Sequence, residues 1–81
     1  MKIKVIGTNT KNRIKLLKNL NRALKETETE VQIELVEDKE DIKTYNNLVT
    51  PALSINGNIV SNGKVLDERE IKHYIKQYFN A

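Results

Sequence analysis

Two short stretches of the chain alternate between apolar and polar residues, a period that is typical of half-buried β-strands. The stretches are Lys2–Ile6 and Val31–Val36. Between them, from about Lys11 to Glu26, apolar residues recur every three or four positions and predict an amphipathic helix. Its apolar stripe comprises Ile14, Leu17, Leu20, Ala23 and Leu24, and Leu16 widens it.

Polar residues of the kind that cap helix N-termini stand before three helical patterns. They are Thr10 or Asn9 before the first helix, Asp38 before a short helix that ends near Tyr45, and Asp67 before a helix from Glu68 to Phe79. In the last helix Glu70 follows Asp67 by three positions, which is typical of a capping box. We expect the inward side chains of the two later helices to be Ile42, Tyr45, Ile71, Tyr74, Ile75, Tyr78 and Phe79.

The stretch from Val49 to Val60 predicts a β-hairpin that opens with the single proline of the chain. Pro51 has no N–H to donate, so it must lie at the first residue of a strand or in a tight turn, where the bond before it can be cis. Asn56 and Gly57 separate two apolar runs and tolerate the positive φ angles of a two-residue turn. The element order is therefore β-α-β-α-β-β-α, which predicts an α/β domain with a four-stranded mixed sheet and helices on both faces.

The composition predicts one small domain that spans residues 1–81, with 38% hydrophobic and 31% charged residues. No apolar run approaches the roughly 20 residues needed to cross a bilayer, and no secretory segment opens the sequence, so we expect no membrane contact. Cysteine is absent, which excludes disulfides, thiolate metal ligands and thiol chemistry. We therefore expect a cytoplasmic protein that uses no cofactor and no metal.

The net charge of +3 conceals an asymmetry along the chain. Residues 1–27 carry eight basic side chains and one acidic one, whereas residues 28–47 carry seven acidic side chains and two basic ones. Such segments either pair with each other within the fold or face different partners.

Residues Met1–Thr8, together with Thr50–Val65, resemble the small redox-active disulfide proteins of bacteria and archaea, which are thioredoxin-like or glutaredoxin-like. The element order, with a proline at the opening of the third strand, also resembles the thioredoxin-like fold, and the resemblance covers nearly the whole chain. It implies a cis-proline that faces a catalytic Cys-x-x-Cys motif, which begins three residues after a glycine that ends the first strand. Here that glycine is Gly7, so the two cysteine positions fall on Thr10 and Arg13.

Neither of these residues can replace a thiol. A threonine hydroxyl is too weak an acid to ionise at a helix N-terminus as a cysteine does, and Arg13 can neither attack nor resolve a mixed disulfide. The resemblance thus implies the fold without its thiol–disulfide activity. We interpret the chain as a redox-inactive domain and not an enzyme. Threonine and arginine are unusual choices for engineered replacements of cysteine, so of natural loss and engineering we favour natural loss.

The first functional hypothesis is that the vestigial active-site groove still binds a ligand. Its residues are Thr8, Asn9, Thr10, Lys11, Arg13, Thr50 and Pro51. In thioredoxin-like proteins the residue before the cis-proline pairs its backbone with an extended peptide or with glutathione, and the resemblance assigns this role to Thr50, opposite Thr10. The chain would then be a binding or structural module for a peptide, a protein or glutathione, or an accessory protein of thiol–disulfide metabolism that binds without turnover. The alternative is that Pro51 only shapes a turn.

Two further hypotheses concern the first helix. Open N–H groups in its first turn, with Lys11 and Arg13, would suit a phosphate or carboxylate, although Thr10 can equally serve as a simple cap. A basic face is formed by Lys11, Lys15, Lys18, Arg22 and Lys25, and the sequence pI is about 9.2. No aromatic residue is interleaved with these bases for stacking, so nucleic-acid binding is disfavoured.

The remaining polar residues predict no catalytic centre. His73 is the lone histidine and reads as a surface residue of the last helix. A cluster of acids, made up of Glu37, Asp38, Glu40 and Asp41, lacks histidine partners and calcium-loop spacing, so it reads as a solvated helix start. We expect a monomer or a weak dimer.

Overall fold

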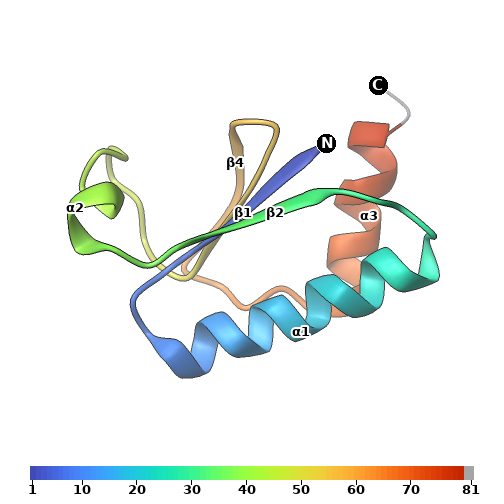
Figure 1. Cartoon of the computed structure of the whole chain (residues 1–81), viewed down its shortest axis with the longest axis horizontal. Coiled ribbons are helices and arrows are strands. Elements are labelled where there is room, and N and C mark those ends of the chain that lie inside the picture. The colour runs from blue at the N-terminus through green and yellow to red at the C-terminus, as the bar shows by residue number, and fades with distance from the viewer. Residues whose placement is uncertain (80–81) are drawn as a thin grey trace.

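The structure is a computed structural model and describes residues 1–79 (Figure 1). Its elements are β1 (Lys2–Ile6), α1 (Thr10–Glu26), β2 (Gln32–Val36), α2 (Lys39–Ile42), β3 (Ala52–Ile55), β4 (Asn58–Asn62) and α3 (Glu68–Phe79). The predicted order of elements is confirmed. The short helix is the main departure, because it ends at Ile42 and not near Tyr45. Within residues 1–79, no helix is both long and apolar enough to traverse a bilayer.

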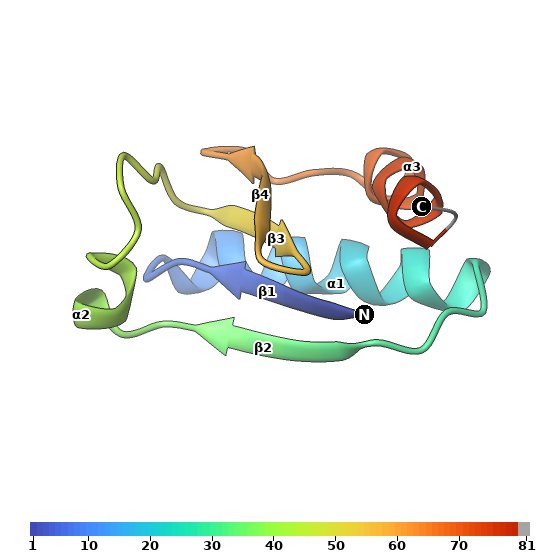
Figure 2. The same ribbon diagram turned by 90° about the horizontal axis from the view of Figure 1, so that it is seen from above.

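The sheet has four strands in the order β2-β1-β3-β4 (Figure 2). β1 lies in the interior of the sheet, parallel to β2 and antiparallel to β3, with Ile3 opposite both Ile33 and Ile55. β3 and β4 form the predicted hairpin, whose register shifts between Leu53 and Ser54. The predicted four-stranded mixed sheet of a thioredoxin-like fold is therefore confirmed.

The larger core fills the space between one face of the sheet and the helices α1 and α3. Its fully buried members are Ile3, Val5, Leu16, Leu20, Ala23, Leu53, Ile55 and Ile71. The centre of the α1 stripe is Leu16 and Leu20, whereas Ile14 is 50% exposed, because α1 turns Ile14 away from this core. The prediction that Phe79 is buried is wrong: its side chain is 68% exposed beyond Ile75, the last buried residue of α3.

A smaller core lies on the opposite face, beneath α2. Ile6, Val36 and Ala52 are buried there, and the predicted inward residues Ile42 and Tyr45 pack against them. A helix of one turn covers only the end of this face, so Lys4 and Glu34 of neighbouring strands pair in the open with 3.9 Å between Lys4 Nζ and Glu34 Oε2. Helices thus flank both faces of the sheet, but unequally.

Local backbone geometry fixes the turn of the hairpin, and local hydrogen bonds fix the start of α3. Asn56 and Gly57 have φ angles of 51° and 86°, as a two-residue turn requires. The Glu70 N–H donates to Asp67 Oδ1 at 2.8 Å, and the Asp67 N–H donates to Glu70 Oε1 at 3.2 Å. These reciprocal bonds are the predicted capping box.

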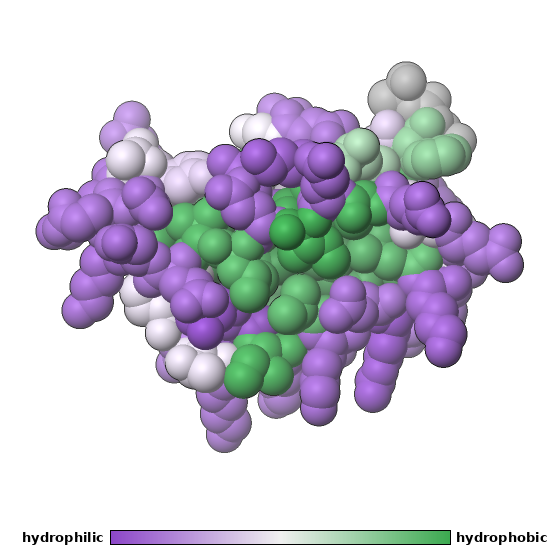
Figure 3. Space-filling view, viewed as in Figure 1, coloured by the Kyte–Doolittle hydropathy of each residue, from purple (hydrophilic) through white to green (hydrophobic). Residues whose placement is uncertain are grey.

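An apolar strip stays open to solvent between β2 and α1 (Figure 3). Ile33 and Leu35 of β2 are 37% and 42% exposed, although they share a face of the sheet with the buried Ile3 and Val5. α1 packs mainly against β1 and α3 and leaves these side chains of the edge strand partly uncovered.

Candidate functional site

The end of β1 lies directly against the proline that opens β3. The Thr50–Pro51 peptide bond is cis, and Pro51 is buried. A Cβ at Gly7 would be in van der Waals contact with Pro51 Cα at 3.6 Å and with Thr50 Cβ at 3.7 Å, so the two segments lie side by side. The backbone between β1 and α1 is therefore held beside the residue that precedes the proline.

The first turn of α1 follows immediately, and Asn9 caps it. Its Oδ1 accepts from the Asn12 N–H at 3.0 Å, and its carbonyl accepts from the Arg13 N–H at 3.0 Å. Of the two caps that the sequence left open, Asn9 is the one used, and Thr10 is the first residue of the helix. Thr10 and Lys11 are exposed, and within residues 1–79 their N–H groups have no acceptor.

Arg13 points inward and ties together the segments that surround the site. Its Nη1 donates to the Gly7 carbonyl at 3.1 Å, and its Nη2 lies 3.7 Å from Glu37 Oε1. Only 14% of the Arg13 side chain is exposed, against 52% for Glu37. The guanidinium thus joins the end of β1, the start of α1 and the segment after β2.

The predicted site residues therefore fall into two groups. Thr50 and Pro51 are brought against Gly7 and, through its carbonyl, next to Arg13. Thr8 and Lys11 are exposed and make no polar side-chain contact with the rest of the site in the part of the chain that the structure describes. Glu37 belongs to the site although the sequence predicted only a solvated acid, because nothing in the local pattern reports a contact between the ends of two strands.

The backbone of Thr50 is the polar feature that the site leaves available. The carbonyls on either side of it, those of Val49 and Pro51, both accept from the Gly63 N–H, at 2.6 and 2.9 Å. Across residues 1–79, neither the N–H nor the carbonyl of Thr50 has a hydrogen-bond partner. An unpaired backbone N–H and carbonyl are the groups to which a peptide strand can add.

Thr10 and Arg13 stand where a Cys-x-x-Cys pair would begin and end. A hydroxyl with a pKa far above 7 supplies no nucleophile here, and the guanidinium already bonds to a main-chain carbonyl. The chain contributes no thiol to exchange with a disulfide. What the site can offer a ligand is N–H donors, the Thr50 backbone and the positive charge of Lys11.

The comparisons with known proteins agree with this geometry. The chain matches the family described as the thioredoxin domain over residues 1–76, and it belongs to that family. No curated protein and no solved structure matches it. It is a family member in which neither position of the dithiol motif is a cysteine.

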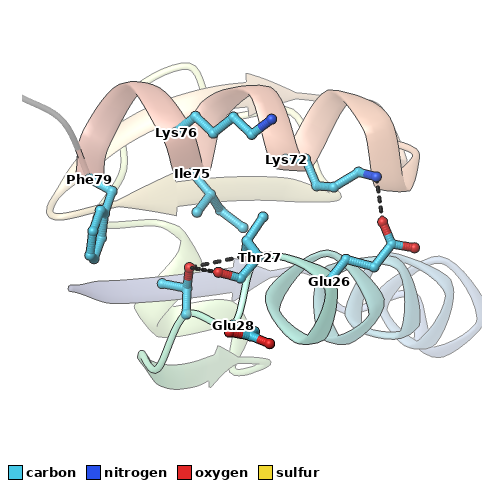
Figure 4. A pocket seen from close by; sticks show the side chains of 8 residues that line it. Glu26, Thr27, Glu28, Lys72, Ile75, Lys76 and Phe79 are labelled. Carbon is cyan, nitrogen blue, oxygen red and sulfur yellow. Dashed lines mark hydrogen bonds and ion pairs between the residues drawn. The ribbon is translucent and has the colours of Figure 1, made fainter.

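A cavity of about 540 Å³ lies at the other end of α1, where that helix meets α3 (Figure 4). Its lining is charged and polar apart from two residues, Ile75 and Phe79. Lys72 of α3 bonds to Glu26 of α1 across it, and this bond lowers the pKa of the Glu26 carboxyl and raises the pKa of Lys72. Sequence reasoning did not find this cavity, because it forms only where the last turns of two distant helices come together.

The other polar residues form no further centre. His73 is exposed, as predicted, with its ring edge-on to Tyr74 at 5.7 Å between centroids. Across residues 1–79, no three histidine or acidic side chains gather as a metal ion would need. Of the acids around α2, Asp38 caps the helix, since its Oδ1 accepts from the Glu40 N–H at 2.8 Å, and Glu40 pairs with Lys43 at 3.5 Å.

Proposed function

We propose that this chain is a redox-inactive thioredoxin domain, not an enzyme, that binds extended peptide segments of partner proteins beside the cis-proline. The observation that carries the proposal is the unpaired backbone of Thr50, which no donor or acceptor within residues 1–79 satisfies. Strand addition needs one N–H and one carbonyl on the protein and does not need a thiol. A cytoplasmic binding role fits a chain in which the fold is kept and the dithiol is not.

Arg13 supports the proposal from the other side of the site. In place of a second sulfur, a long side chain bonds to the Gly7 carbonyl and approaches Glu37. The segment that lies against Thr50 and Pro51 is thereby held without the partner cysteine. A preorganised site loses less conformational entropy on binding than a mobile one.

The test is chemical-shift mapping with unlabelled pentapeptides of alternating apolar and polar residues. We expect shifts concentrated at residues 8–13 and 50–52. A matched pair of peptides sharpens the result: methylating the amide that pairs with Thr50 should abolish binding, while methylating the next amide should leave it intact. If no peptide shifts these residues at concentrations up to about 1 mM, the proposal is wrong.

Glutathione is the second candidate ligand, for an accessory role in thiol–disulfide metabolism without turnover. The exposed Lys11 and the open N–H groups of Thr10 and Lys11 favour it, because glutathione carries two carboxylates. Lys11→Ala should weaken glutathione binding, whereas Lys25→Ala, at the far end of the same helix, should not. An uncharged peptide should be indifferent to both changes.

Nucleic-acid contact through the outer face of α1 is the weakest alternative. The five basic residues of that face are exposed, whereas Arg13, a sixth basic residue of the same helix, points inward. Binding of a duplex would fall steeply with salt, since each neutralised phosphate releases counterions. Absence of binding at low salt removes this alternative.

A further inference from the structure

The outer edge of β2 presents unpaired backbone groups beside exposed apolar side chains. The Gln32 N–H donates to the Met1 carbonyl at 3.0 Å, and the Val36 carbonyl accepts from the Gly7 N–H at 2.9 Å. In a strand, successive residues direct their backbone groups to opposite sides. The groups of Val31, Ile33 and Leu35 are therefore directed away from β1, along the edge of the sheet.

The two edges of the sheet differ in how well they are protected from pairing with another chain. β4 is irregular, since its register with β3 shifts between Leu53 and Ser54, and it carries polar residues such as Asn58 and Asn62. Bulges and irregularities of this kind protect an edge from pairing with another chain. β2 pairs with β1 without a shift and exposes Ile33 and Leu35 on the face that α1 leaves open (Figure 3).

We propose that β2 pairs antiparallel with β2 of a second copy of this chain, around a two-fold axis at Ile33. A two-fold axis perpendicular to the sheet keeps the same face of both copies on one side. The sheet would then continue from one copy into the other, and the open apolar strips would adjoin. Ile33 and its counterpart would exchange both backbone hydrogen bonds, and Val31 would pair with Leu35 in the same manner.

The side chains of β2 select this register over its neighbours. With Ile33 at the axis, Ile33 opposes its own counterpart and Val31 opposes Leu35, while Glu30 falls opposite Val36 at the end of the strand. The Gln32 amide opposes the Glu34 carboxylate, to which it can donate. Glu34 is already partly neutralised, with Lys2 Nζ at 3.1 Å, and this lysine lowers the pKa of its carboxyl. The side chains along β2 of one copy are therefore complementary to those along β2 of the other.

The alternative registers bring carboxylates together or set one opposite Ile33, in the open apolar strip itself. An axis at Glu34 would set that carboxylate opposite its own copy, which is destabilising. An axis at Gln32 would set Glu30 opposite Glu34, and an axis at Leu35 would set Glu37 opposite Ile33. A shift by a single residue would place apolar side chains opposite polar ones, on the wrong face.

This interface is separate from the candidate peptide site. β1 lies between β2 and β3, so a strand added to β2 leaves Thr50 unobstructed. Peptide binding and self-association can therefore fail or succeed independently of each other.

The register is tested by mixed cross-linking, for which a chain without cysteine is suited because every disulfide reports only the introduced residues. Gln32→Cys and Glu34→Cys are prepared separately and oxidised alone and as a mixture. We expect a cross-linked dimer mainly in the mixture, because residues 32 and 34 face each other across the axis. Efficient cross-linking of Glu34→Cys alone, or of Gln32→Cys alone, would overturn the register.

The interface itself is tested by sedimentation over a range of concentrations. Ile33→Asp places two carboxylates at the axis and should raise the dimer dissociation constant roughly tenfold or more. The matched control is Phe79→Asp, which adds the same charge at an exposed apolar residue of α3 and should leave the constant unchanged. A chain that stays monomeric up to about 1 mM, or a dimer indifferent to Ile33→Asp while the cross-linking mixture stays unreacted, would refute the proposal.

Discussion

The large core keeps the packing of the thioredoxin-like fold, whereas the candidate site keeps the backbone arrangement of the family but not its cysteines. In the core, α1, α3 and three strands fill one continuous apolar space in which Ile3, Val5 and Leu53 are fully buried. At the site, the backbone arrangement of Gly7, Thr50 and Pro51 is present while the two positions of the dithiol hold a hydroxyl and a guanidinium. The fold and the chemistry of this family are thus specified by separate residues, and the second set can change without the first.

The largest effect is expected from restoring cysteines at the two positions of the dithiol motif. Thr10→Cys/Arg13→Cys should convert a chain without thiols into one that reduces insulin disulfides, because the helix N-terminus favours a thiolate at residue 10. Insulin reduction and a thiol titration measure the gain, and the pKa of the thiol at residue 10 should lie below the ordinary value of about 8.5.

The matched control is Lys15→Cys/Lys18→Cys, which has the same spacing on the exposed middle of α1. Its thiols should titrate near the ordinary pKa and show no such activity. If both pairs of cysteines behave alike, the N-terminus of α1 does not stabilise a thiolate as the active site of the family does.

The core is tested by Leu53→Ala, which removes a fully buried side chain from the middle of β3. The free energy of unfolding should fall by about 2–5 kcal/mol, from lost apolar burial and the cavity left behind. Leu35→Ala is the control, because that side chain is 42% exposed at the sheet edge, and its cost should be under about 1 kcal/mol. Urea denaturation measures both, and equal losses would contradict the division between core and edge.

The hydrogen bond from Arg13 to the Gly7 carbonyl should contribute less to the free energy of unfolding than the burial of Leu53 does. Arg13→Ala leaves the partly buried Gly7 carbonyl without its donor, and we expect a loss of about 1–3 kcal/mol in the free energy of unfolding. The contact with Glu37 should add little, since that carboxylate is half exposed. Lys15→Ala, on the solvent side of the same helix, should change stability by no more than about 0.5 kcal/mol. A loss at Arg13 as small as at Lys15 would mean that the guanidinium does not hold the site.

The smallest expected change in stability is the one that acid causes through the surface ion pairs. Bonds from Lys72 and Lys2 lower the pKa values of Glu26 and Glu34, and the backbone N–H of Glu70 lowers the pKa of Asp67. Groups with a lowered pKa in the folded chain contribute stability above their unfolded pKa values, near pH 4, and lose it as the pH falls through the folded values.

The melting temperature should therefore decline slightly below about pH 4, and added salt should reduce the decline because these carboxylates are exposed. Glu34→Gln should flatten part of it. At the alkaline end, Glu70 raises the pKa of Lys64 and Glu26 raises that of Lys72, so their contributions are lost only as the pH rises through those raised values. A melting temperature that rises on acidification would contradict these signs.

Much of the fold could be predicted from local sequence, because local chemistry decides it. Alternation marked β1, and Asp67 with Glu70 marked the start of α3, since both signals act over a few residues. The exposure of Ile14 and Phe79 could not be predicted in this way. Helical periodicity gives the direction of an apolar side chain but not whether another element covers it.

In the candidate site, too, the features that depend on local sequence could be predicted, and those that depend on contacts between distant segments could not. The cysteine-equivalent positions followed from their spacing after Gly7, and the choice between Asn9 and Thr10 as cap required the backbone geometry. The contact between Arg13 and Glu37 joins segments that are distant in the chain and carries no local signal. The same holds for the cavity between α1 and α3.

The interior position of β1 bears on how this chain folds. The hairpin of β3 and β4 can close over two residues, but β1 must meet β3 across a loop that includes α1, β2 and α2. Closing a long loop costs entropy before any contact repays it, and non-local pairing slows folding. The meeting of Ile3 and Val5 with Leu53 and Ile55 is therefore the step expected to limit the folding rate. Substitutions in that strand pair should slow refolding, whereas those in the hairpin turn should mainly hasten unfolding.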